Sequence, residues 1–214
     1  MNLVSLLLMW LKTKEVGASK CHITKKLSHS LRSLGRTHAG RLRHYAPHAC
    51  APYLKVSSLQ GSIVQPKNIV EEIISQFEGV IPKASWGETS LFYNPGKILP
   101  NGVYFCTIKE KNGDNDKASE LDREGAFRLS IGISKITYEK KFGVKPKRPS
   151  KGCIIDTGHD FTALNELMPH PIYGWMSWVQ VLSPSESTFA NIFPLIAEAH
   201  SNAVIKFNKK TANK

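Results

Sequence analysis

The charge pattern of the chain changes at Pro66, and this change limits the folded part to the residues that follow. Residues 1–66 hold ten Lys or Arg and one acidic residue, Glu15, so their net charge is ten minus one, or +9. Residues 67–214 hold nineteen Lys or Arg and sixteen acidic residues, which gives +3. A segment with such an excess of like charge cannot bury enough apolar surface to fold. We therefore predict a basic, disordered extension or targeting segment over residues 1–66.

Two stretches within this basic segment bear on targeting. The apolar run 3–11 has the length of a signal-peptide core, but no basic residue precedes it, and Lys12 and Glu15 interrupt the sequence after it. The stretch 24–36 places leucines at helical spacing among basic residues, as in organelle presequences and membrane-surface helices. A further alternative is an extension that is not part of the natural product. We expect a cytoplasmic protein, or one whose targeting segment is removed.

Residues 67–206 are predicted to form one α+β domain. Apolar residues at helical spacing predict a first helix from Pro66 to Gly79, a short helix over 134–143 and a long helix from Ser183 to about Asn202. Short apolar runs between turn sequences predict strands at 80–85, 89–93, 102–109, 126–133 and 175–182. This order indicates an antiparallel sheet of about five strands with helices packed on one face. The polar tail 207–214 is expected to fray.

The common sequence signatures of nucleotide-binding and hydrolase sites are absent. The chain has no G-x-G-x-x-G, no P-loop and no G-x-S-x-G, and its four cysteines form no C-x-x-C pair. No run approaches the ~18 apolar residues that a membrane-spanning helix needs. We expect no cofactor and no membrane span.

Four segments of the predicted domain resemble a known family. They are residues 84–96, 118–134, 170–189 and 194–200, and the blocks LDR…FRLSIG and HPIYGWMSW carry most of the likeness. The family is the uncharacterised bacterial domain of unknown function 6194, and the resemblance covers about Lys67 to Lys206. It implies a domain without an assigned activity. The order of the elements is also loosely similar to small α+β domains of the MmcQ/YjbR type, at the level of fold alone.

One candidate pocket centres on Arg128, which interrupts an apolar strand. The side chain either faces solvent or is a buried cation, and a buried Arg needs a carboxylate, for which Asp122 and Glu88 are the natural suppliers. In an aromatic cleft, Arg128 would hold a small acidic ligand through both ends of its guanidinium group.

The segment that begins at His170 supplies the rest of this candidate pocket. An aromatic strand face there could line an apolar pocket, with His170 as a polar group at its mouth. Alternatively, the tryptophans belong to the core and His170 bonds the backbone. The predicted pocket residues are Asp122, Arg128, His170, Tyr173 and Trp175.

A second group of polar residues lies in the predicted loop TGHDF. Asp156, His159 and Asp160 could bind a metal, or a carboxylate could orient His159 as a base. A protein metal site usually needs three or more ligands with contributions from elsewhere in the chain. We therefore expect no metal there.

Three functional classes follow from these residues. The first is a module that binds a small acidic molecule or a partner peptide. The second is an enzyme that uses His170 or His159 with a nearby carboxylate. The third is non-specific nucleic-acid binding through basic residues 12–55 and 140–151, which requires that the basic segment is retained. We expect binding rather than catalysis.

Overall fold

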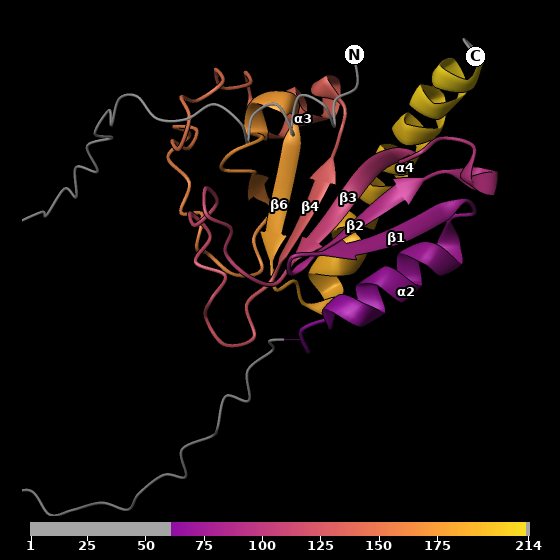
Figure 1. Ribbon diagram of the computed structural model, residues 1–214. Helices are drawn as coiled ribbons and strands as arrows, with labels where there is room; N and C mark the ends of the chain where they lie inside the picture. The colour runs from indigo at the N-terminus through magenta and orange to yellow at the C-terminus, as the bar shows by residue number, and fades with distance from the viewer. Residues whose placement is uncertain (1–60, 213–214) are drawn as a thin grey trace, which may run out of the picture. The chain divides into compact units, whose positions relative to one another are not determined.

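The computed structural model describes residues 61–212, which form a six-stranded antiparallel sheet with helices on one face (Figure 1). The predictions for residues 1–60 lie outside this part of the chain. The α+β class is confirmed, and β5 is the strand that the sequence did not predict. The elements are α2 (Pro66–Gln76), β1 (Val80–Ser85), β2 (Glu88–Tyr93), β3 (Val103–Lys109), β4 (Arg128–Gly132), α3 (Lys135–Phe142), β5 (Met168–Pro169), β6 (Trp178–Leu182) and α4 (Glu186–Ala212).

The strands lie in the order β1-β2-β3-β4-β6-β5, and every neighbouring pair is antiparallel. The first four strands therefore form a continuous meander. After β4 the chain leaves the sheet through α3 and a long loop, and it returns as the edge strand β5 and then as β6 beside β4 (Figure 1). The loops before β4 and before β5 are the long connections in this topology.

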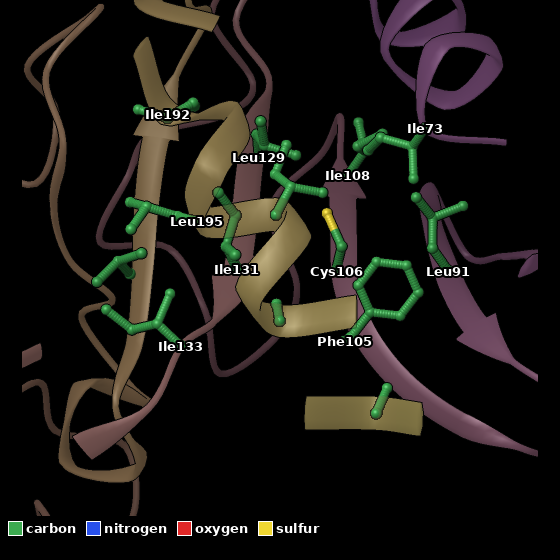
Figure 2. Packing of buried hydrophobic residues seen from close by; sticks show 14 of the residues in the cluster. Ile73, Leu91, Phe105, Cys106, Ile108, Leu129, Ile131, Ile133, Ile192 and Leu195 are labelled. Carbon is green, nitrogen blue, oxygen red and sulfur yellow. The ribbon is translucent and has the colours of Figure 1, made fainter. Parts of the chain in front are cut away.

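The apolar face of the sheet packs against α2 and α4. Ile73 from α2 and Leu195 from α4 reach the side chains of the central strands, as Figure 2 shows. A register shift in the β2–β3 pair places Phe105 and Cys106, two consecutive residues, on this same face. Cys106 is fully buried there, and the core is continuous across β2, β3, β4 and β6.

The last helix differs from its prediction at both ends. It begins at Glu186, and its cap is Ser185 rather than Ser183, because the Ser185 hydroxyl accepts a hydrogen bond from the Thr188 N–H at 3.2 Å. It continues to Ala212 instead of ending near Asn202, so the predicted fraying of the tail is wrong. Buried Phe207 explains the extension, since its ring packs edge-on against Tyr93 at 5.2 Å.

The opposite face of the sheet, which we call the second face, carries three rows of side chains set by the strand register. Loop segments 110–127 and 144–177 partly cover it, with Ile155, Phe161 and Met168 as a small apolar cluster. The aromatic row holds Phe92, Tyr104 and Trp178, the polar row holds Ser90, Thr107, Ser130 and Gln180, and the charged row holds Glu88, Lys109 and Arg128.

Candidate functional site

Arg128 is a buried cation with a bidentate carboxylate partner. Its side chain comes from the first residue of β4 and is 2% exposed. Nη1 donates to Asp116 Oδ1 at 2.9 Å, and Nη2 donates to Asp116 Oδ2. Nη1 also lies 3.4 Å from the Ser119 hydroxyl. Of the two alternatives for Arg128, the structure therefore shows the buried cation and not the solvent-facing charge.

Lys109 and Glu88 complete a cluster in which the charges balance. Lys109 Nζ lies 3.0 Å from Asp116 Oδ2 and 3.9 Å from Glu88 Oε2. Burial alone would raise the pKa of Asp116, but the hydrogen bonds and the charge of Arg128 outweigh burial and hold this pKa well below its usual range. We call Glu88, Lys109, Asp116 and Arg128 the charged cluster. It contains two cations and two anions.

The carboxylate that pairs with Arg128 differs from both predicted suppliers. Asp122 is exposed and accepts hydrogen bonds from the backbone N–H of Asn112 at 3.1 Å and from its side-chain amide at 2.7 Å. Glu88 contacts Lys109 instead. The sequence does not single out Asp116, because this residue lies in a stretch, 109–124, that is rich in polar and charged residues. No sequence signal distinguishes it from the other acidic residues there.

His170 is buried beside the charged cluster and is fixed by the backbone. Its Nδ1 accepts hydrogen bonds from the N–H groups of Ile172 at 3.1 Å and Tyr173 at 3.2 Å. The proton of the neutral ring therefore sits on Nε2. Burial lowers the pKa of His170 well below its ordinary value, and the positive charge of Arg128 lowers it further. His170 is thus a neutral hydrogen-bond donor, and neither ring nitrogen has a free lone pair to accept a proton.

Two half-exposed tyrosines border the charged cluster on its solvent side. The Tyr173 ring packs against His170 with 4.9 Å between ring centroids. Burial raises the pKa of Tyr173, and the negative charges of Asp116 and Glu88 add to this effect. Burial likewise raises the pKa of Tyr104, with smaller contributions from Tyr173 and Glu88. The two phenol groups therefore share the electrostatic environment of the cluster.

Tyr104 belongs to the aromatic row, whose other members pack on its ring. Trp178 stacks on Tyr104 with centroids 5.3 Å apart, and Phe92 lies 5.9 Å from Tyr104 on the other side. Gly132 of β4 makes this stacking possible, because a Cβ there would lie 3.0 Å from the Trp178 ring. The adjacent cavity of about 50 Å³ also touches Met176 and has room for water rather than for a metabolite.

Trp175 does not take the predicted place in a strand. It lies in a 3₁₀ turn, Gly174–Met176, that ends at Ser177 with a left-handed backbone (φ +64°), so the strand starts only at Trp178. The Trp175 ring packs against the guanidinium of Arg148 at 5.0 Å. Of the five predicted pocket residues, the structure brings together Arg128, His170 and Tyr173, and it gives Asp122 and Trp175 other partners.

The second predicted group has local partners as well. His159 Nδ1 lies 3.0 Å from the Thr157 hydroxyl, and Asp160 accepts hydrogen bonds from the backbone and the hydroxyl of Thr162. Asp156 is exposed. Over residues 61–212, no three or more His, Cys, Asp or Glu side chains are grouped so that they could hold a metal ion.

Two buried donors on the second face have no acceptor among the described residues. They are Arg128 Nε and the Ser130 hydroxyl. Arg128 and Ser130 are two residues apart on β4 and therefore point to the same face of the sheet. Buried polar groups in proteins are nearly always hydrogen-bonded, so two unpartnered groups in neighbouring positions indicate a place where an acceptor can bind.

No curated protein and no solved structure matches the chain, and the loose likeness to the MmcQ/YjbR type stays a prediction. A family model does match, over residues 64–212, which is most of the chain and all of the described sheet and helices. The chain therefore belongs to the family of unknown function DUF6194.

Proposed function

We propose that the domain is a binding module for a small neutral molecule that combines a planar apolar part with a carbonyl oxygen. The observation that carries this proposal is the pair of buried donors, Arg128 Nε and the Ser130 hydroxyl, that have no acceptor within residues 61–212. The Nε2–H of His170 is a third donor. The His170 ring lies near the other two donors, since it is close enough to Arg128 for the positive charge there to lower the pKa of His170. A carbonyl oxygen offers two lone pairs to such donors.

The balance of charge favours a neutral ligand over the acidic one that the sequence suggests. Asp116 already occupies both terminal nitrogens of Arg128, so no free fork remains for a ligand carboxylate. Lys109 is likewise shared between Asp116 and Glu88. A further carboxylate would add a third negative charge to two positive ones and would be repelled.

The planar part of the ligand would lie on the exposed aromatic side chains. Tyr104 is 49% exposed and Tyr173 is 43% exposed, and both border the charged cluster. Offset stacking on such rings stabilises a planar group by about 0.5–1.5 kcal/mol beyond the burial of its surface. Because Arg128 and Ser130 are buried, a ligand reaches them only if the side chains that cover them move.

The enzyme alternative has less support from the same geometry. A general base needs a free lone pair within reach of the substrate. In His170 two backbone donors occupy Nδ1, and Nε2 carries the proton. His159 has Thr157 as its neighbour, stacks on Phe161 and meets Phe142 edge-on. We infer that His170 orients a ligand and does not transfer a proton.

The test is a ¹H–¹⁵N NMR titration of the full chain with benzamide, and with benzoate as the acidic counterpart. We expect benzamide to shift the amide signals of β4 and of residues 170–178, and to bind more tightly than benzoate. Ser130→Ala should weaken benzamide binding about tenfold, the value of one hydrogen bond to a buried donor. The matched control is Ser201→Ala, on the exposed side of α4, which should leave binding unchanged. Equal affinity in both variants, or no shifts on the second face, would refute the proposal.

A further inference from the structure

Positive charge is concentrated in α3 and the loop after it. Residues 135–154 hold seven Lys or Arg and one acidic residue, Glu139, which gives +6. Since residues 67–214 carry +3 in total, the rest of that part carries −3. We call residues 135–154 the basic patch. Its basic residues are Lys135, Lys140, Lys141, Lys145, Lys147, Arg148 and Lys151.

Aliphatic side chains stand in solvent within this patch. Ile136 is 80% exposed on α3, one helical turn before Lys140, whereas Tyr138 of the same helix is buried. Val144 follows Gly143, the residue that ends α3, and is 90% exposed. An apolar residue at this position often packs back onto the helix that it follows, but Val144 does not. Two nearly fully exposed aliphatic residues among seven basic ones indicate a surface that meets a charged and partly apolar partner.

We propose that the basic patch binds the surface of an anionic lipid bilayer. Lysine and arginine side chains would contact the headgroup phosphates, and Ile136 and Val144 would enter the interface between headgroups and acyl chains. Each basic side chain near such a surface contributes favourably, and buried aliphatic groups add to the affinity. The contact is peripheral, since none of the helices in residues 61–212 has the length and apolar character needed to cross a bilayer.

The exposed residues favour lipid over nucleic acid as the polyanion. Binding to single-stranded nucleic acid combines basic side chains with aromatic rings on which bases stack. Of the aromatic residues in and beside the patch, Tyr138 is buried, Phe142 packs against Tyr138, and Trp175 packs against Arg148. Ile136 and Val144 have no role in binding phosphates, but they are the kind of side chain that enters a lipid interface.

The aliphatic contribution is tested by co-sedimentation of the full chain with phosphatidylcholine vesicles, with and without about 30% phosphatidylserine. In the double variant Ile136→Ser and Val144→Ser the charge is unchanged, and we expect about tenfold weaker binding to the anionic vesicles. The matched control is Ile98→Ser with Ile205→Ser, two exposed isoleucines outside the patch, which should bind like the wild type. Circular dichroism checks that both variants fold.

The charge contribution is tested by two equal reversals at helix ends. Lys140→Glu with Lys141→Glu alters the last turn of α3, and Lys209→Glu with Lys210→Glu alters the last turn of α4. We expect the α3 pair to lose more than about tenfold in vesicle binding and the α4 pair to lose little. Equal losses in the two pairs, wild-type binding after the serine substitutions, or no binding to anionic vesicles would overturn the proposal. If the α3 charge reversal weakened binding to a single-stranded oligonucleotide more than it weakened binding to vesicles, the proposal would be overturned in favour of nucleic acid.

Discussion

At the scale of single residues, the second face contains two buried serines in opposite situations. The Ser130 hydroxyl has no hydrogen-bond partner within residues 61–212, whereas Ser119 donates to Gln180 at 3.3 Å and contacts Arg128. A buried hydroxyl without a partner costs stability, and a satisfied one contributes to it. A position that retains such a cost in the folded domain is a natural place for ligand recognition.

This contrast predicts opposite effects on stability. Ser130→Ala should raise the free energy of unfolding by about 1 kcal/mol, because it removes an unsatisfied polar group. Ser119→Ala should lower it by about 1 kcal/mol, because it takes a partner from Gln180 and Arg128. Urea denaturation of the full chain measures both. A loss of stability in Ser130→Ala would mean that its hydroxyl already has a partner in the unliganded protein.

Single residues of the site could be predicted only in part. The sequence points to Arg128, because a cation in an apolar strand must be either exposed or paired, and to His170 and Tyr173. It cannot identify Asp116, because the pairing of Asp116 with Arg128, twelve positions later, depends on the path of the β3–β4 connection through space. The prediction that Trp175 lies in a strand is wrong for a similar reason. The left-handed backbone at Ser177 separates it from the strand, and the local apolar pattern does not reveal that break.

At the scale of elements, the helices and long strands could be predicted from the spacing of apolar residues. The caps of α3 at Ser134 and Gly143 are confirmed, because their side-chain and backbone requirements are local. The two-residue strand β5 has no periodicity to detect. The sequence predicts too early an end for α4, because most residues after Asn202 are polar and the two buried positions, Ala203 and Phe207, are far apart among them.

A substitution at Phe207 distinguishes a packed end of α4 from a frayed tail. Phe207→Ala should lower the free energy of unfolding by about 3–5 kcal/mol, as expected for the loss of a buried phenylalanine. Thermal or urea unfolding of the full chain measures this change. The control is Lys209→Ala, two residues further along on the exposed side. A change below about 0.5 kcal/mol for Phe207→Ala, the range of surface substitutions, would mean that these residues are not packed.

At the scale of the whole molecule, the sheet separates two different environments. One face is an apolar core shared with α2 and α4 (Figures 1 and 2). The other face holds the charged cluster and the aromatic row. The sequence predicts which residues alternate along a strand. It does not predict the register between strands, and the register decides that Glu88, Lys109 and Arg128 share one row.

Stability of the whole domain should fall as the pH falls below about 6.5. Burial lowers the pKa of His170, and it also lowers the pKa of His200. The unfolded chain therefore takes up protons near pH 6.5 while the folded domain does not, so acidification favours unfolding. His170 alone contributes up to about 1.4 kcal/mol per pH unit. Chemical denaturation between pH 8 and pH 5 measures the slope, and His170→Asn, which keeps an acceptor for the backbone, should reduce it. A flat profile in the wild type would contradict the neutral state of His170.

The most direct measurement of the central claim is the ¹H–¹⁵N signal of the His170 side chain, recorded with and without benzamide. We predict a neutral ring with its proton on Nε2 at pH 7, as the two hydrogen bonds to Nδ1 require. Benzamide should move this Nε2–H signal downfield, because the ligand carbonyl accepts a hydrogen bond from it. A proton on Nδ1, or an Nε2–H signal that stays in place while benzamide binds elsewhere, would contradict a ligand site on the second face.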